Sequence, residues 1–262
     1  MAEEKKDSMK TLDNEELIMD IYRSVPSRKI RYFGNYFRCL KIEKLTHSKL
    51  FKKSWIYSCA KKDIPPDMHN EKHKIMMEIM RVDDSSTECK NNSFKRANNV
   101  LRMFLGKNYK NENKNSVGLI IPDTRDNKNF NYEGYIDNLK RTISKHSDKV
   151  KQYRKNYPKC ESVIFFICDE SNNYIEVANK NELKEQEIYN NFKIHYAYAD
   201  KKFIDIIRQC NADFVIWLGL YKEIYVNGKN VVYPNAVIYD IKNLKYNGLD
   251  YNSELMLKMI KG

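Results

Sequence analysis

The chain has 262 residues, of which 42% are hydrophobic and 31% are charged, and its formal net charge is +12 at pH 7. This composition is typical of a globular protein rather than a disordered one, and no apolar run approaches the roughly 20 residues of a membrane span. The positive charge favours an acidic partner, with nucleic acid first, and we expect no membrane partner. The polar N-terminus and the absence of a Cys-x-x-Cys pair lead us to expect a cytoplasmic protein with reduced thiols.

The N-terminal part of the chain shows a change from polar to periodic sequence. We expect residues 1–13 to form a flexible tail. Apolar residues at helical spacing predict helices at residues 15–25 and 32–45. Short apolar runs then predict strands at residues 54–60 and 74–82.

The middle of the chain contains the clearest loop signal. A helix is predicted at residues 93–105, followed by a polar loop at 106–116 that is the best place for an insertion or a domain boundary. A buried strand is predicted at 117–121. Residues 132–157 have the most regular helical periodicity in the chain, and Pro158 ends that helix.

The C-terminal half alternates between helical patterns and buried strands. Helices are predicted at residues 201–209 and 253–260, and an Asn-Gly turn predicts a hairpin between 224–226 and 231–233. The remaining apolar runs predict strands at residues 162–168, 192–198, 214–220 and 236–241. The sequence therefore predicts a single α/β domain over residues 14–262, with a mixed β-sheet flanked by helices.

Two acidic residues stand out near the predicted strand at 74–82. Asp67 follows Pro66, and Glu78 lies inside the apolar run Ile75–Met80. An unpaired carboxylate in an apolar strand costs several kcal/mol, so Glu78 requires a partner, a proton or a metal ion. If the intervening segment closes a hairpin, Asp67 and Glu78 can share one Mg²⁺ or Mn²⁺ ion, which could activate water for phosphodiester hydrolysis.

This pattern resembles the PD-(D/E)xK nuclease superfamily, which has the restriction-endonuclease-like fold. In that family a Pro-Asp precedes an acid two residues before a Lys, on adjacent strands of a small mixed sheet, and a helix and a further strand follow. The resemblance implies a metal-dependent endonuclease with Asp67 and Glu78 as catalytic metal ligands. Met80 occupies the position of the family Lys. Lys74, on the same face of the predicted strand, is our substitute for it.

Other interpretations of these acids remain open. Asp67 can be an ordinary turn residue, and Glu78 can pair with Arg81 or a buried Lys without any metal. A rival site consists of Asp213 with the acid-x-Lys sequence of Asp240 and Lys242. Only a short helix is predicted after Lys242, so the family core would be incomplete there.

The predicted helix at 132–157 is strongly basic on its polar side. Each of these cations can contact a phosphate, which would make nucleic-acid binding salt-dependent. The expected nucleic-acid-binding residues are Lys140, Arg141, Lys145, Lys149, Lys151, Arg154 and Lys155. His146 lies on the apolar side of the same helix, and we expect a hydrogen-bonded core residue there.

Acidic residues also follow two predicted strands, at Asp123 and at Asp169-Glu170. The carboxyl ends of strands are where open α/β sheets bind ligands. Helix capping or a loop start explains such acids equally well.

Three functions are compatible with the sequence. The first is a metal-dependent nuclease that hydrolyses phosphodiester bonds in DNA or RNA, in restriction, defence or repair. The second is a non-catalytic nucleic-acid-binding or regulatory protein with the same fold, which Met80 favours. The third is an accessory protein whose role is contact with other proteins.

Overall fold

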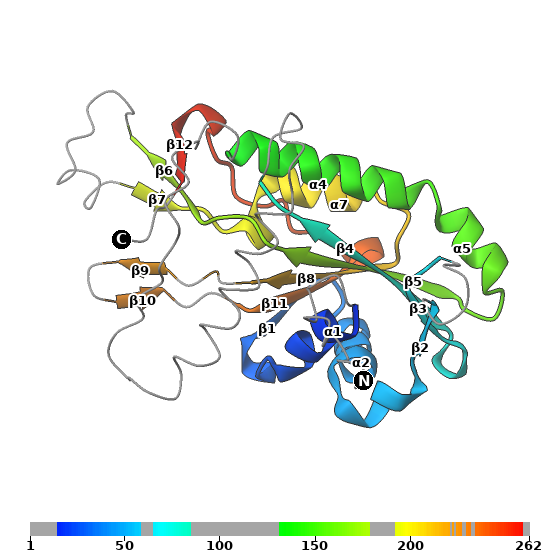
Figure 1. The fold of residues 1–262 in the computed structure, drawn as a ribbon. Coiled ribbons are helices and arrows are strands. Elements are labelled where there is room, and N and C mark those ends of the chain that lie inside the picture. The colour runs from blue at the N-terminus through cyan, green and yellow to red at the C-terminus, as the bar shows by residue number, and fades with distance from the viewer. Residues whose placement is uncertain are drawn as a thin grey trace, which may run out of the picture.

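The computed structural model describes residues 15–58, 65–84, 131–178, 192–220, 222, 224–226, 229–231 and 234–258. These residues form a mixed seven-stranded sheet with helices on both faces (Figure 1). The predicted α/β class, a mixed sheet flanked by helices, is confirmed. The elements expected at 93–105, 106–116 and 117–121 lie outside the described residues.

The large sheet has three parallel strands at its centre. In spatial order its strands are β1 (Ile30–Phe33), β11 (Ala236–Asp240), β8 (Phe214–Gly219), β5 (Ser162–Asp169), β4 (Ile75–Val82), β3 (Met68–Asn70) and β2 (Ile56–Tyr57). Strands β4, β5 and β8 run parallel, whereas β3 and β11 run antiparallel to β4 and β8. Strand β1 is parallel to β11, and β2 is antiparallel to β3.

Two smaller sheets accompany the large one. Strands β12 (Met256–Lys258), β6 (Tyr174–Val177) and β7 (Phe192–Ile194) form an antiparallel sheet. Strands β9 (Ile224–Val226) and β10 (Lys229–Val231) pair antiparallel, which confirms the hairpin predicted from the Asn-Gly turn, although its second strand begins at Lys229 rather than at the predicted residue 231.

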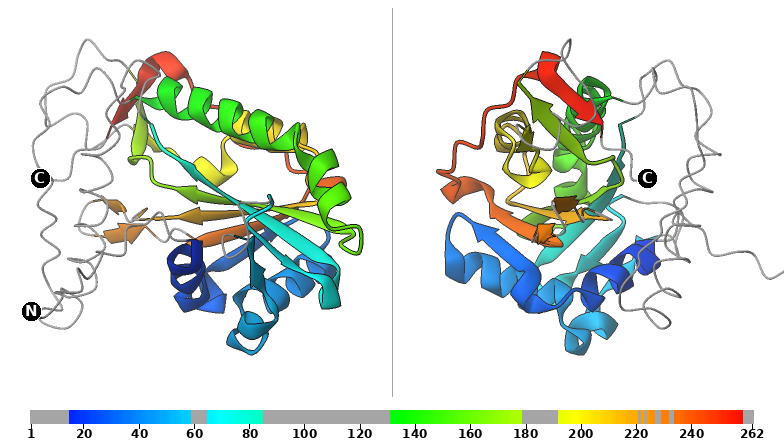
Figure 2. Two further views of the ribbon diagram at one scale, coloured as in Figure 1. Left: turned by 45° about the vertical axis from the view of Figure 1, so that its right-hand side comes forward. Right: turned by 90° about the vertical axis from the view of Figure 1, so that its left-hand side faces the viewer.

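The helices form two layers around the large sheet. They are α1 (Glu15–Ser24), α2 (Tyr36–His47), α4 (Tyr132–Ser147), α5 (Val150–Asn156) and α7 (Lys201–Arg208). Helices α1 and α2 cover one face, and α4, α5 and α7 cover the other (Figure 2).

Strand β5 shows why the central strands are continuously apolar. Its side chains alternate between the two cores: Phe165 packs toward α4 and α7, while Phe166 packs toward α1 and α2. A strand with a helix layer on each face needs apolar residues at every position. The strands predicted at 74–82, 162–168, 214–220 and 236–241 are confirmed as β4, β5, β8 and β11.

The helix predicted at 132–157 is in fact two helices. The carbonyl of Ser147 accepts a bond from the Asn211 side-chain amide at 3.2 Å, and its hydroxyl accepts the Asn211 N–H at 2.9 Å. This contact between residues far apart in the chain lies at the last residue of α4. The second helix, α5, begins at Val150. The single-helix prediction was wrong because no local Gly or Pro signals the break.

Three further predictions need correction. The helix predicted at 32–45 begins only at Tyr36, because Ile30–Phe33 pairs with β11 as strand β1. Gly34 makes the turn between them with φ of +105°. Asn35 then caps α2 by accepting the Arg38 N–H at 3.1 Å.

The helix predicted at 253–260 was also wrong. Residues Ser253–Leu255 form one 3₁₀ turn, and Met256–Lys258 pairs with β6 as strand β12. The strand predicted at 192–198 ends at Ile194. In both places pairing with β6 decides the structure, and periodicity within the segment does not reveal that partner.

Candidate functional site

The structure brings Asp67, immediately before β3, next to Glu78 of the adjacent strand β4. Strand β3 runs antiparallel to β4 with Met68 opposite Met77, so the next position places Asp67 opposite Glu78. The Asp67 N–H donates to Glu78 Oε2 at 3.3 Å, and the Ile79 N–H donates to Asp67 Oδ2 at 2.6 Å. The segment between the two acids includes strand β3, whose pairing with β4 fixes this register.

The surroundings of the pair disfavour a negative charge on both carboxylates at once. Only 5% of the Glu78 surface is exposed. Burial, followed by the charge of Glu78, raises the pKa of Asp67 from 3.8 to about 7. Two carboxylates in this arrangement resist being ionised together, so a proton or a cation is favourable beside them.

Glu78 has a partner that sequence reasoning did not assign. His146, near the end of α4, places Nδ1 2.7 Å from Glu78 Oε1. The Tyr153 hydroxyl, from α5, lies 3.3 Å from the same nitrogen. The expectation of a hydrogen-bonded His146 is confirmed, but the side chain is only partly buried, with 17% of it exposed, rather than part of the core. Arg81, the other suggested partner, binds Glu170 instead, at 2.6 and 2.9 Å.

Lys74 does not lie at the carboxylate pair. It precedes β4 in a left-handed conformation with φ of 59°, so it does not share the alternating faces of the strand. Its side chain is 60% exposed and forms an ion pair with Glu161 at 2.5 Å. Lys149, between α4 and α5, is the cation whose charge opposes the rise in the Asp67 pKa. The Lys74 side chain, paired with Glu161, therefore does not contact the carboxylate pair.

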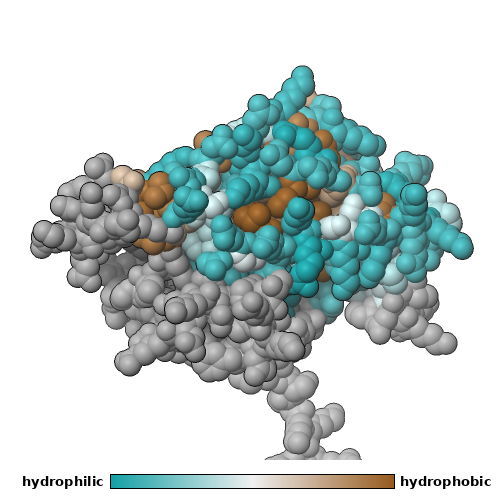
Figure 3. Space-filling model, turned by 90° about the horizontal axis from the view of Figure 1, so that it is seen from above, coloured by the Kyte–Doolittle hydropathy of each residue, from teal (hydrophilic) through white to brown (hydrophobic). Residues whose placement is uncertain are grey.

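The basic side of α4 and α5 faces outward. Arg141 donates to Asn138 Oδ1 at 2.8 Å, and Arg154 pairs with Asp213 at 3.1 Å. The five lysines of this side form no ion pair with any described residue. We call these five the lysine ridge: Lys140, Lys145, Lys149, Lys151 and Lys155. Seen from above, this layer of the molecule is largely hydrophilic with smaller apolar patches (Figure 3).

The rival acids at the other end of the sheet do not form one site. Asp213 accepts bonds from Val163 N–H and Arg154, and its other oxygen lies 2.9 Å from Lys242 Nζ. Asp240 points to the opposite face, where Arg38 of α2 lies 3.4 Å away. The two carboxylates are separated by the sheet, so they cannot share an ion.

A second set of buried polar residues lies at the carboxyl ends of β4, β5 and β8. Asp169 accepts bonds from Trp217 Nε1 at 2.9 Å and from Tyr135 OH at 3.3 Å. The Lys222 ammonium donates to the Ser171 hydroxyl at 2.8 Å. Asp84 accepts the Tyr174 hydroxyl at 2.6 Å. These bonds tie strand ends to α4 and β6. Asp123, expected at an equivalent strand end, lies outside the described residues.

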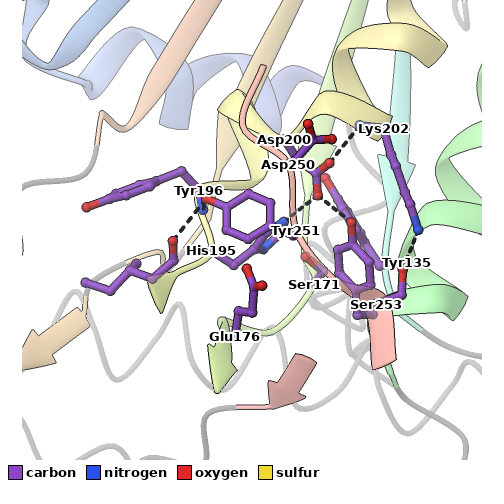
Figure 4. A network of polar contacts seen from close by, with 12 residues as sticks. Tyr135, Ser171, Glu176, His195, Tyr196, Asp200, Lys202, Asp250, Tyr251 and Ser253 are labelled. Carbon is purple, nitrogen blue, oxygen red and sulfur yellow. Dashed lines mark hydrogen bonds and ion pairs between the residues drawn. The ribbon is translucent and has the colours of Figure 1, made fainter. Parts of the chain in front are cut away.

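His195 belongs to the same polar region (Figure 4). Its Nε2 lies 2.7 Å from Asp200 Oδ2, which also accepts the Tyr132 hydroxyl at 2.7 Å. Burial lowers the pKa of His195. Sequence reasoning found no partner for His195. The sequence feature that could have indicated this partner is Asp200, the N-cap residue before the amphipathic helix α7.

Comparison with known proteins identifies no relative. The chain matches no protein-family model, no curated protein and no solved structure. Within the described ranges, no helix has the length and apolar character needed to cross a bilayer. In the same ranges, no three His, Cys, Asp or Glu side chains are grouped so as to hold a metal ion. The Asp67–Glu78 pair is thus a two-carboxylate arrangement.

Proposed function

We propose that this chain is a metal-dependent nuclease whose centre is the Asp67–Glu78 pair. The observation that carries the proposal is the strained pair itself: two acids opposite each other on β3 and β4, with the pKa of Asp67 raised to about 7. Magnesium sites in nucleases use one or two protein carboxylates, with water and substrate phosphate as the other ligands.

One carboxylate oxygen of the pair is open to a divalent cation. Asp67 Oδ2 and both oxygens of Glu78 are in use, but Asp67 Oδ1 accepts no hydrogen bond from a described residue. Asp67 and Glu78 would hold the ion, which supplies positive charge and lowers the pKa of a bound water. Lys149 would stabilise negative charge beside the pair, and His146 would orient the Glu78 carboxylate.

The lysine ridge supplies the means of binding substrate. Lys149, one of these five lysines, has a charge that acts to lower the pKa of Asp67, which supports a link between the ridge and the pair. Strand β4 is followed, among the described residues, by α4 and then by β5. This order supports our proposal of a restriction-endonuclease-like core, in which a helix and a further strand follow the acidic strand.

A second function, nucleic-acid binding without cleavage, is favoured by Met80. This residue stands where the family has Lys, and it is buried in the core against α4. His146 also occupies one oxygen of Glu78. In this alternative His146 and Tyr153 satisfy Glu78 permanently, and the lysine ridge alone carries the function.

The test is cleavage of supercoiled plasmid and of a structured RNA with Mg²⁺ or Mn²⁺. We expect metal-dependent cleavage by the wild type and its loss in Asp67→Asn and Glu78→Gln. Asp213→Asn is the matched control, since it removes a buried carboxylate at the rival position, and it should retain cleavage. Thermal unfolding with and without Mn²⁺ gives a second readout, because an ion bound at the pair stabilises the wild type and Asp213→Asn but not Asp67→Asn or Glu78→Gln.

Three results would change the conclusion. Loss of cleavage in Asp213→Asn alone would move the chemistry to the other end of the sheet. Salt-sensitive binding without cleavage by the wild type would establish the second function. Absence of both binding and cleavage would leave contact with other proteins as the role of the chain.

A further inference from the structure

The outer face of α2 carries two adjacent aromatic rings that the fold does not bury. Tyr36 is 54% exposed and Phe37 is 78% exposed. Their ring centroids are 5.5 Å apart with an interplanar angle of 76°. The ring of Tyr32 packs against the ring of Tyr36, with 5.4 Å between the two centroids. Single exposed apolar residues are common on protein surfaces, but a braced pair at the start of a helix is a better indication of a contact surface.

The exposed charges that follow Phe37 on this side of α2 are positive. Lys41 and Lys44 follow Phe37 at i+4 and i+7, so they lie on the same side of α2, about 6 and 10 Å along its axis. Both are exposed, and neither forms an ion pair with a described residue. The acid of this helix, Glu43, is buried and accepts a hydrogen bond from the Tyr32 hydroxyl. An aromatic ring followed by two unpaired lysines thus faces outward.

Arg38 is not part of this outward face. Its guanidinium lies 5.1 Å from the centre of the Phe214 ring and 3.4 Å from Asp240 Oδ1, so the sheet already engages it. The available cations are therefore the two lysines. Their ammonium groups suit phosphates, which they neutralise as point charges.

We propose that the outer face of α2 binds single-stranded nucleic acid, with an unpaired base stacked on Phe37 and phosphates at Lys41 and Lys44. Stacking on an exposed ring requires a base that is not already stacked in a duplex, so the surface discriminates in favour of single strands. The alternation of an aromatic platform with cations along one helix face complements that polymer. An acidic peptide would use the lysines but would leave Phe37 without a partner.

This surface is separate from the Asp67–Glu78 pair. Helix α2 lies on the opposite face of the sheet from α4 and α5 (Figures 1 and 2). Strand β1, which leads into α2, is four strand spacings from β4, or about 19 Å. The proposal shares its partner with the proposed nuclease function but does not rest on cleavage, since binding is measured in EDTA.

The experiment compares the affinity of the full chain for a labelled oligothymidine with its affinity for a duplex of the same length. The measured quantity is the ratio of the two affinities, because phosphate contacts at the lysine ridge serve both polymers. We expect Phe37→Ala to lower single-strand affinity about 10-fold, equivalent to about 1.4 kcal/mol. Duplex affinity should be nearly unchanged, and Phe37→Trp should retain the wild-type ratio.

Two further variants sharpen the test. Leu50 is 89% exposed and cannot stack on a base, so Leu50→Ala is the matched control and should change neither affinity. The double variant Lys41→Ala/Lys44→Ala should reduce the slope of log affinity against log salt by about 1.4 for the single strand. Phe37 is so exposed that its removal should not disturb folding, and thermal unfolding verifies this.

An unchanged affinity ratio in Phe37→Ala would overturn the proposal. It would also be overturned if polyglutamate bound to the wild type with the same dependence on Phe37, which would assign the surface to an acidic peptide. Either result is independent of whether the Asp67 and Glu78 variants lose cleavage.

Discussion

The imidazole of His146 lies 2.7 Å from Glu78 Oε1 and joins the end of α4 to the centre of β4. One residue further on, α4 ends at Ser147, whose carbonyl accepts a hydrogen bond from the Asn211 side chain. The junction that follows and α5 present Lys149 and Tyr153 to the carboxylate pair. The end of α4, the junction and α5 therefore all contribute groups to the surroundings of the two acids.

The raised pKa of Asp67 predicts a specific pH dependence of stability. Because the pKa is higher in the folded state, that state binds the proton more tightly than the unfolded chain does. The contribution of Asp67 to the free energy of unfolding is therefore fully present below about pH 4 and is lost as the pH rises to about 7. One pKa unit corresponds to about 1.4 kcal/mol. We expect Asp67→Asn to be more stable than the wild type at pH 8.

Urea denaturation at pH 5 and pH 8 checks this prediction. Asn can still accept the Ile79 N–H, so the variant removes the charge and retains the bond. Equal pH dependence of stability in the wild type and in Asp67→Asn would show that the pKa of Asp67 is not raised in the folded state.

The contact between His146 and Glu78 predicts a loss of stability on removing the ring. His146→Leu leaves a buried carboxylate oxygen without its donor, which should cost about 1–3 kcal/mol. His146→Gln can still donate to Glu78 and should recover much of that loss. Urea denaturation of the three proteins at pH 7 measures both effects, and equal losses in the Leu and Gln variants would argue that packing matters rather than the bond.

We expect substitution of the two candidate lysines, Lys149 and Lys74, to have different effects on the cleavage rate. Lys149→Ala should lower the rate of metal-dependent cleavage about 100-fold, because it removes positive charge beside the carboxylate pair. Lys74→Ala should leave the rate unchanged, because that side chain is exposed and pairs with Glu161. Lys149→Ala should also move the stability loss attributed to Asp67 to higher pH. A rate loss in Lys74→Ala instead would restore the choice made from sequence.

Asp213 predicts a pH dependence of the opposite sign. Burial acts to raise its pKa, but the Val163 N–H, Lys242 and Arg154 outweigh this effect, so the pKa is lowered. Its contribution to stability is present above the unfolded pKa and is lost as the pH falls through the folded value. Asp213→Asn should be less stable than the wild type at pH 7 by about 1–2 kcal/mol. The difference should shrink in acid, and thermal unfolding at pH 7 and pH 3 compares the two.

Much of the fold could be predicted from the sequence. The central strands β4, β5 and β8 are apolar at nearly every position because helices cover both faces of the sheet, and that pattern is visible in the chain. Helix α7 shows its amphipathic spacing and its Asp200 cap. The importance of Glu78 also follows from sequence, since an acid in an apolar strand requires a partner.

Tertiary structure alone decided the rest, because each remaining feature depends on residues far apart in the chain. The break after Ser147 needs Asn211, and strand β12 needs β6 as its pairing partner. The identity of the partner of Glu78 required the fold that brings α4 over β4. Local periodicity reports which side of an element is buried, whereas the contacts that position charged groups arise only when distant segments pack together.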